Sequence, residues 1–220
     1  MLQHVWERTC QARYLTDVVI ATDDERIRAA AQEFRARVIM TRADHASGTD
    51  RVAEAASASQ AGIVVNVQGD EPMIDPAAID AAILGLLDDS AADVPMGTIK
   101  KRIERPTDIQ DPNVVKVVTD AQGNALYFSR SPIPYTREGA EQPPYFKHIG
   151  LYVYRRDFLL SYPDLPVGPL ECAERLEQLR ALENGYKIRV VETEYESLGV
   201  DTPEDWKQVA ELFEKPMVNR

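Results

Sequence analysis

The stretch IVVNVQGDEP, residues 63–72, decides how the fold of this chain is interpreted. Its first half is apolar and rich in β-branched residues, which is typical of a strand buried in a sheet. The apolar run stops before Gly69, and the carboxylate of Asp70 follows at once. A buried strand that ends in an acid places that acid at the edge of an α/β sheet, where ligands bind. Gly69 would let a ligand approach the backbone closely.

Strand and helix patterns alternate on both sides of this stretch. We expect strands over 17–24 and 37–40, and helices over 25–34, 50–59 and 76–87. This alternation is typical of βαβ units in a mostly parallel sheet, and the nearly continuous apolar strands fit a sheet that is covered on both faces. The sequence therefore predicts a three-layer, Rossmann-like α/β fold.

The second half of the chain predicts an antiparallel extension of this sheet. It forms a β-arm around residues 114–155, with a proline-rich loop in its middle. Strands are expected over 114–120, 125–130 and 147–155. The remaining pattern predicts a helix over 171–183 that ends at Asn184-Gly185, a strand over 187–192, and a helix with Thr202 as its N-cap.

Composition limits the classes of function that are open to the chain. It has 220 residues, of which 44% are hydrophobic, so it can bury a core as one domain. A net charge of −11 argues against a nucleic-acid polymer as partner, because the phosphate backbone requires a basic face. No apolar run approaches the ~20 residues that span a bilayer. We expect a cytoplasmic protein in which Cys10 and Cys172 are reduced and partly buried.

Two aspartates follow predicted strands and are candidate metal ligands. Asp70 ends the strand described above, and Asp201 follows the segment SLGV at 197–200. Carboxylates from two strand ends can hold Mg²⁺ together with substrate phosphates and water. The competing interpretation is structural, since either acid could cap a turn or the next helix. For Asp70 the two interpretations are equally good, and for Asp201 the cap is favoured by the following TPED.

Motifs along nearly the whole chain resemble one family. They are TRADHASGTDR (41–51), NVQGDEP (66–72), NVVKVV (113–118), ALYFSRSPIPY (125–135), KHIGLYVYR (147–155), LEQLRALENGYKI (176–188) and GVDTPEDW (199–206). Their order and spacing resemble those of 3-deoxy-manno-octulosonate (KDO) cytidylyltransferases.

The resemblance implies a nucleotide-diphospho-sugar transferase-like fold and a defined reaction. CMP would pass from CTP to the anomeric hydroxyl of KDO, giving CMP-KDO and pyrophosphate for lipopolysaccharide biosynthesis. It also implies Mg²⁺ as cofactor, with Asp70 and Asp201 as the catalytic metal ligands, and a homodimer. A related sugar acid as acceptor, or a non-catalytic relative that keeps the fold, are the alternatives.

The resemblance also assigns substrate-binding residues one by one. Their types fit these roles, because small residues suit a base edge and an arginine fork suits a carboxylate. Several of these residues have a plainer alternative. It is an exposed loop position for His45, a solvated cation for Arg130, core packing for His148 and especially for Tyr152, and an exposed helix face for Glu177 and Gln178. The assignments are Arg42, His45, Ser47, Gly48 and Thr49 for cytosine; Gln68 for sugar or nucleotide; Ser129 and Arg130 for the KDO carboxylate; and His148, Tyr152, Glu177 and Gln178 for the sugar.

The chain departs from the family pattern at its start. The first strand of the family and its glycine- and arginine-rich triphosphate loop have no match, and the chain begins inside an amphipathic helical pattern. We therefore expect residues 1–220 to form a single, N-terminally incomplete cytidylyltransferase domain. Without that strand, the sheet should have unpaired edges, and CTP should bind poorly.

Overall fold

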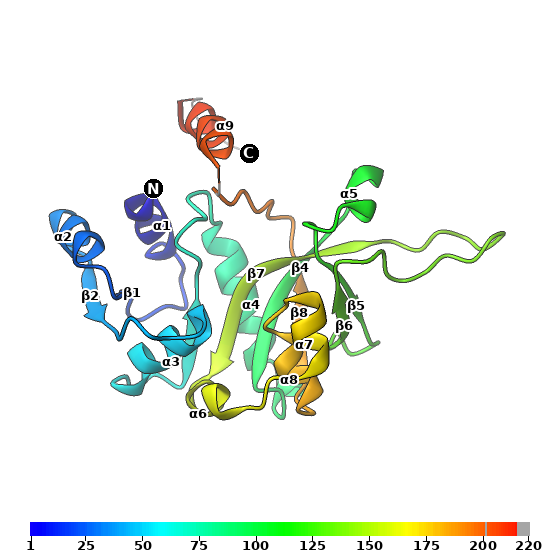
Figure 1. Ribbon diagram of the computed structural model, residues 1–220, viewed down its shortest axis with the longest axis horizontal. Coiled ribbons are helices and arrows are strands. Elements are labelled where there is room, and N and C mark those ends of the chain that lie inside the picture. Colours follow the sequence, from blue (N-terminus) through cyan, green and yellow to red (C-terminus); the bar gives the residue numbers. More distant parts are fainter. Residues whose placement is uncertain (201, 215–220) are drawn as a thin grey trace.

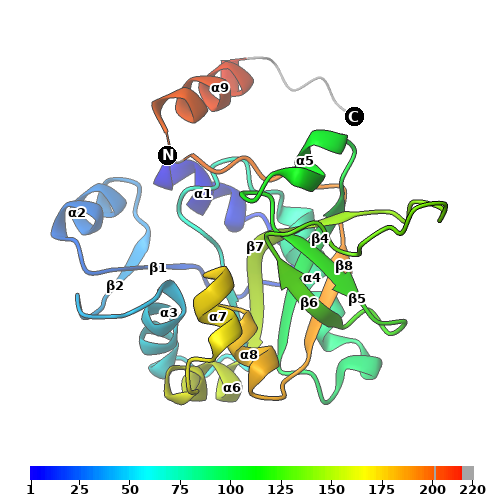
Figure 2. The same cartoon turned by 45° about the vertical axis from the view of Figure 1, so that its right-hand side comes forward.

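The computed structural model describes residues 1–200 and 202–214. It has three layers, with a central sheet between helix α4 (Pro76–Leu87) on one face and helices α3 (Gly48–Ser57), α6 (Arg156–Ser161), α7 (Pro169–Glu174) and α8 (Leu179–Glu183) on the other (Figures 1 and 2). The expected α/β architecture is confirmed. None of the helices in the described part of the chain has the length and apolar character needed to cross a membrane.

The main sheet is organised around its longest strand, β7 (Phe146–Arg155). Strand β7 runs antiparallel to β3 (Ile63–Asn66), β4 (Met96–Arg102) and β5 (Lys116–Thr119). Strands β3, β4, β5 and β8 (Ile188–Glu192) thus share one direction, while β7 and β6 (Ala125–Ser129) run the opposite way. The mostly parallel sheet with an antiparallel extension is therefore present, and β7 is inserted between two of its parallel strands.

A second, smaller sheet holds β1 (Val19–Thr22) and β2 (Arg37–Met40), which pair in parallel. Among the strands that the structure describes, β1 pairs only with β2, and β3 pairs only with β7. Strands β1 and β3 therefore each have one unpaired edge, as we expected from the missing first strand of the family. The side chains of β3 over residues 63–65 are only half-buried, although all three are β-branched and apolar.

Side-chain caps fix where the main helices begin. Asp24, Ser47 and Asp75 each accept a hydrogen bond from the first turn of the helix that follows. These helices are α2 (Glu25–Glu33), α3 and α4, and they lie within two residues of the ranges expected from periodicity. The other helices are α1 (Leu2–Thr9), α5 (Pro106–Gln110) and α9 (Pro203–Glu214), the last with Thr202 as its cap.

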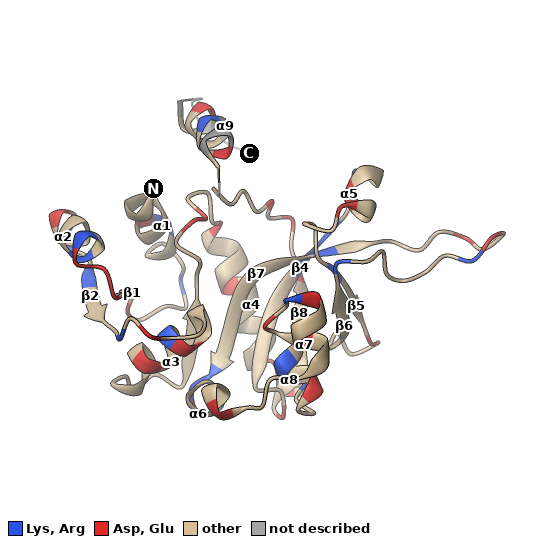
Figure 3. Cartoon of the chain, viewed as in Figure 1, with Lys and Arg blue, Asp and Glu red and all other residues tan. Residues whose placement is uncertain are grey.

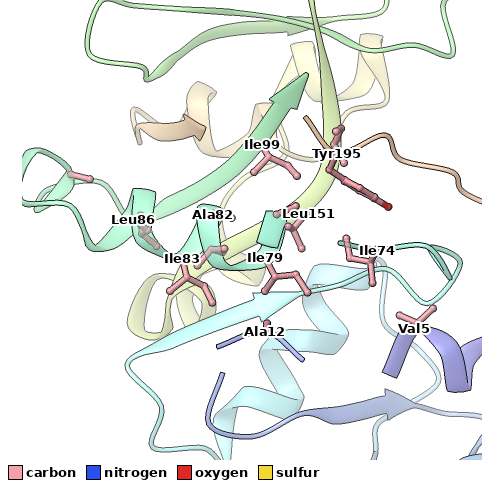
Figure 4. Close-up of a cluster of buried hydrophobic side chains, with 14 of the residues drawn as sticks. Val5, Ala12, Ile74, Ile79, Ala82, Ile83, Leu86, Ile99, Leu151 and Tyr195 are labelled. Atoms are coloured by element: carbon pink, nitrogen blue, oxygen red, sulfur yellow. The ribbon is translucent and has the colours of Figure 1, made fainter. Parts of the chain in front are cut away.

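Two hydrophobic clusters lie on opposite faces of the main sheet. One cluster packs α4 against β4 and β7 through Ile79, Ile83, Leu86, Ile99 and Leu151 (Figure 4). The other packs α3, α6 and α8 against the opposite face. Apolar side chains therefore leave the strands in both directions, which explains their continuous apolar runs.

Two expectations from the sequence were wrong. The single helix over 171–183 is interrupted, because Arg175 adopts a left-handed conformation with φ 52°. This break separates α7 from α8 and leaves residues 175–178 as a turn. Cys10 and Cys172 are free thiols, as expected, but both are exposed.

Candidate active site

The loop between β3 and α4 carries Asp70. Asn66 ends the strand in a buried position, and the Gln68 side-chain amide lies 3.4 Å from the Asn66 Oδ1. The Asp70 carboxylate is partly exposed and makes no hydrogen bond or ion pair to the residues that the structure describes. Its backbone carbonyl accepts a hydrogen bond of 2.9 Å from the Val200 amide. The next residue, Asp201, lies outside the described residues.

The residues expected to face cytosine surround the start of α3. Ser47 caps the helix by accepting from the Asp50 amide, and a Cβ at Gly48 would have open space around it. Thr49 is buried, and its hydroxyl is 3.5 Å from the phenol oxygen of Tyr154. The start of α3 therefore has open space around its backbone at Gly48, as the close approach of a small ligand requires.

His45 and Arg42 lie in the loop that leads to α3. The His45 side chain is 6% exposed, so the exposed-histidine alternative is wrong. Its Nε2 contacts the carboxylate of Glu54, and this contact is the main reason why the pKa of Glu54 is lowered. Arg42 is exposed, with its Nε 3.4 Å from a carboxylate oxygen of Asp44.

A hollow of about 420 Å³ adjoins this loop. Three acidic residues line it, Asp44, Asp50 and Glu54, and they outnumber the one cation, Arg42. His45, Leu160 and Pro163 also line it. Carboxylates can accept hydrogen bonds from the amino group of a base, but they repel phosphates. This hollow therefore suits a base better than a triphosphate.

Strand β7 presents His148 and Tyr152 on one face, as the alternation predicted. Their ring centroids are 5.4 Å apart, and Tyr152 donates a 3.1 Å hydrogen bond to the Gln178 Oε1. Tyr152 also packs against the cluster beside α8, so its packing alternative describes part of what it does. Burial raises the pKa of Tyr152 well above its ordinary value and therefore keeps the phenol neutral.

Thr98 on β4 determines which ring nitrogen of His148 carries the proton. Its hydroxyl is 2.8 Å from the carbonyl of Leu151 and 3.0 Å from the His148 Nε2. A hydroxyl has one proton, so donation to the carbonyl leaves it to accept from a protonated Nε2. Burial lowers the pKa of His148 to about 3, so the ring is neutral at pH 7. Its Nδ1 is then a hydrogen-bond acceptor.

The turn between α7 and α8 places Glu177 and Gln178 against this polar face. Gln178 is buried and Glu177 is half-buried, so the exposed-helix alternative is wrong for both. Burial raises the pKa of Glu177, and the nearby side chains of Ser47 and Thr49 oppose that rise. The turn therefore lies next to the start of α3.

Two contacts hold the turn in place. Arg180 on α8 forms a buried, two-pronged ion pair with Glu171 on α7, at 2.6 and 2.8 Å. Glu183 on α8 accepts hydrogen bonds from the backbone amides of Leu170 and Glu171. The turn is therefore a fixed feature of the site, because both of its flanking helices are pinned together.

Buried polar atoms without a protein partner gather near this turn. They include the Glu177 Oε1, the Gln178 Nε2 and the Asp50 Oδ1. Buried polar groups in folded proteins are nearly always hydrogen-bonded, so such atoms indicate a place where a polar ligand or water completes the network. An acceptor and a donor on consecutive residues suit the hydroxyl groups of a sugar.

Ser129 and Arg130 lie at the end of β6, beside α7. The Ser129 hydroxyl donates to the Glu174 Oε1 at 2.6 Å, and the Arg130 Nε donates to the Glu174 carbonyl at 2.8 Å. Arg130 is thus half-buried and anchored, which contradicts the solvated-cation alternative. Next to it, the fully buried Lys116 donates to three backbone carbonyls.

Sequence reasoning missed the residues that support this site. The pattern did not single out Thr98, Glu174 or Lys116. Alternation along β4 places the polar Thr98 on the same face of the sheet as the apolar Met96, and this signal was available in the sequence. Nothing local to Glu174 or Lys116 distinguishes them from other charged residues.

This chain is similar to known proteins over most of its length. A family model described as cytidylyltransferase matches residues 1–188. The 3-deoxy-manno-octulosonate cytidylyltransferase of Solibacter usitatus (strain Ellin6076) is 71% identical over 97% of this chain and 84% of its own length. The chain belongs to the cytidylyltransferase family. It is a nucleotidyltransferase, and the resemblance drawn from its motifs is confirmed.

Further relatives of this cytidylyltransferase agree. The 3-deoxy-manno-octulosonate cytidylyltransferase of Geobacter sulfurreducens is 56% identical over 96% of this chain and 88% of its own length. A solved structure of CMP:2-keto-3-deoxy-manno-octonic acid synthetase complexed with CTP superposes with a TM-score of 0.90 at 45% identity. It covers 96% of this chain and 86% of that one. A more distant synthase from Anaerococcus prevotii, at 12% identity and a TM-score of 0.63, shares the fold alone.

Proposed function

We propose that this cytidylyltransferase transfers CMP from CTP to the anomeric hydroxyl of KDO. The products are CMP-KDO and pyrophosphate, and CMP-KDO would serve lipopolysaccharide biosynthesis. The observation that carries the proposal is the set of unpartnered buried polar atoms where α3, β7 and the 175–178 turn converge. The names of relatives up to 71% identical point to the same substrates.

Each group of residues has a role in this proposal. Arg42, His45 and the α3 residues Ser47, Gly48 and Thr49 recognise the cytosine. His148 accepts from a sugar hydroxyl through its Nδ1, and Glu177 and Gln178 bind further hydroxyls. Catalysis then depends on holding the attacking oxygen in line with the α-phosphorus. The remaining assignments are Gln68 at the phosphates or sugar, Tyr152 beside Gln178, and Ser129 and Arg130 toward the sugar carboxylate.

We propose Mg²⁺ as the cofactor, held by Asp70 and Asp201. Among residues 1–200 and 202–214, no three His, Cys, Asp or Glu side chains are grouped to hold a metal, so a site here uses fewer protein ligands. The free carboxylate of Asp70 fits that requirement. The Val200–Asp70 hydrogen bond supports the pairing, because it holds the residue before Asp201 in the sequence against the Asp70 loop. When bound, Mg²⁺ offsets the charge on the phosphates.

The proposal includes a cytoplasmic homodimer of this single domain. An extended arm leaves the sheet between β6 and β7 (Figure 1), and Tyr135 in it is 87% exposed. We propose that a second copy of the chain covers this arm.

The test is pyrophosphate release from CTP in the presence of KDO and Mg²⁺. Asp70→Asn should lower kcat at least about a hundredfold if the carboxylate is a metal ligand, with the thermal melting temperature preserved. Asp93→Asn is the matched control, because Asp93 is an exposed acid that pairs with Lys187. An 8-amino analogue of KDO in parallel distinguishes a related sugar acid. Absence of pyrophosphate release with either sugar, or full activity of Asp70→Asn, would contradict the proposal.

A further inference from the structure

The segment after β8, residues 193–200, lies against the loop that carries Asp70. In both cartoon views it passes beside the start of α4 before it reaches α9 (Figures 1 and 2). Tyr195 is buried in the cluster that contains Ile74 of the same loop (Figure 4). Two chain segments that are more than a hundred residues apart in sequence therefore form one unit beside the candidate metal site.

Glu71 is the residue that joins them. One of its carboxylate oxygens accepts from the Tyr195 phenol at 2.5 Å, and the other accepts from the Ser197 hydroxyl at 2.5 Å. The Val200 amide then donates to the carbonyl of Asp70, the neighbour of Glu71. We call these three hydrogen bonds the Glu71 clamp.

The loop is also held from the opposite side. Arg8 of α1 donates through its Nε to the Ile74 carbonyl at 2.6 Å, and Val5 packs in the same cluster as Ile74. The loop that follows Asp70 is therefore held by α1 through Ile74 and by residues 195–200 through Glu71 and the Asp70 carbonyl. The side chain of Asp70, by contrast, has no partner in the described part of the chain.

Hydrogen bonding also determines which of two adjacent acids can bind a cation. Both oxygens of Glu71 are occupied by hydroxyl donors, whereas those of Asp70 are free. A carboxylate that accepts two hydrogen bonds from hydroxyl groups is held in one orientation and is less available as a metal ligand.

We infer that Glu71 is a positioning residue, which holds the loop that carries Asp70 against the segment that ends at Val200. This inference rests on the proposed function, since it concerns the metal site assigned there. Residues that orient metal ligands typically change metal affinity by 10–100-fold when they are removed. Glu71 would act in this way on its neighbour Asp70.

The experiment measures Mn²⁺ binding to the free protein by electron paramagnetic resonance. Tyr195→Phe and Ser197→Ala each remove one donor, and Glu71→Ala removes the acceptor. We expect each single variant to weaken Mn²⁺ binding, Glu71→Ala by roughly tenfold or more. In the Glu71→Ala background, Tyr195→Phe should have almost no further effect, because the bond it removes is already lost.

Glu196→Gln is the matched control. Glu196 is a carboxylate on the same segment, but it pairs with Lys101 and Lys147 at the end of β4 and the start of β7. Its removal should lower stability and leave Mn²⁺ affinity unchanged. Hydrogen exchange gives a second readout, because the Val200 amide should exchange faster in the clamp variants than in Glu196→Gln.

The outcomes separate the inference from the proposed function. If Asp70→Asn abolishes Mn²⁺ binding but the clamp variants bind as the wild type does, the inference is wrong and the proposed function stands. If Asp70→Asn binds Mn²⁺ normally, the proposed metal site is wrong. If Glu71→Ala does not fold, Mn²⁺ binding by Tyr195→Phe and Ser197→Ala tests the inference, which is wrong if both variants bind as the wild type does. Equal weakening by Glu196→Gln would also overturn the inference, because any anchor of the segment would then suffice.

Discussion

At His148, a single hydroxyl decides what the ring can offer a ligand. Thr98 accepts from Nε2, because its own proton is donated to the carbonyl of Leu151. Burial keeps the ring neutral, since charging it would cost more than in water. The result is a fixed acceptor at Nδ1 inside a site whose other polar groups include the donor Nε2 of Gln178.

This burial predicts a specific dependence of stability on pH. The folded-state pKa of His148 is about 3, below the ordinary value of 6.5. As pH falls through 6.5 the unfolded chain takes up the proton first, so the free energy of unfolding should fall by about 1.4 kcal/mol per pH unit until pH approaches 3. Urea unfolding at several pH values between 4.5 and 7.5 measures this slope.

His148→Gln should remove that contribution. Glutamine cannot titrate, and the stability difference between wild type and variant should shrink by about 2–3 kcal/mol from pH 7.5 to 4.5. His4→Gln is the matched control outside the β7 face. A wild-type slope that persists in His148→Gln would mean that other groups cause it.

At the scale of elements, the packing of α4 on the sheet depends on a close approach. Gly85 lies in the middle of α4, and a Cβ there would be 2.2 Å from the Val191 Cγ2 on β8. Glycine is unfavourable in the middle of a helix. Its presence at position 85 is explained by the close contact between α4 and β8, which leaves no room for a Cβ.

Gly85→Ala should therefore destabilise the protein although alanine favours helices. The propensity gain is about 1 kcal/mol, and overpacking against a stiff β-branched side chain costs about 1–3 kcal/mol, so we expect a net loss of up to about 2 kcal/mol. Thermal and urea unfolding measure the change. Val191→Ala in the Gly85→Ala background should recover part of it, and Gly48→Ala, where there is open space, is the control. A stabilised Gly85→Ala variant would show that α4 can shift freely.

For the whole molecule, the sheet brings distant segments to one place. Strand β7 forms one wall of the candidate sugar site, and the start of α3 and the 175–178 turn reach it from chain positions about a hundred residues apart. Acidic and basic residues are interspersed along the ribbon rather than collected on one element (Figure 3). Substrate anions are therefore expected to depend on local donors in the site and not on the overall field of the protein.

The proposed homodimer gives a prediction at this scale. Light scattering after size-exclusion chromatography should give the mass of two chains at micromolar concentration. Tyr135→Ser should shift the equilibrium toward one chain, because it removes a large exposed aromatic from the arm. Leu126→Ser is the control, since Leu126 is also exposed, at 62%, but lies on β6. A wild-type protein with the mass of one chain would contradict the dimer.

The sequence by itself determined the order and type of most elements and the family. The strand at 63–66 and the helix at 76–87 are encoded locally, by apolar runs and by the Asp75-Pro76 helix start. Such signals depend on residues a few positions apart, so they can be read along the chain. The motif at 176–188 was likewise visible, although its conformation was not.

Only the tertiary structure decided how these parts form a site. The left-handed Arg175 breaks the helix that periodicity predicted, and packing of Glu171 against Arg180 holds the turn that results. The contacts of Glu71 with Tyr195 and Ser197 join segments that no local pattern connects. The physical reason is that burial, hydrogen-bond partners and pKa depend on which distant side chains meet, and that is set by packing of the whole chain.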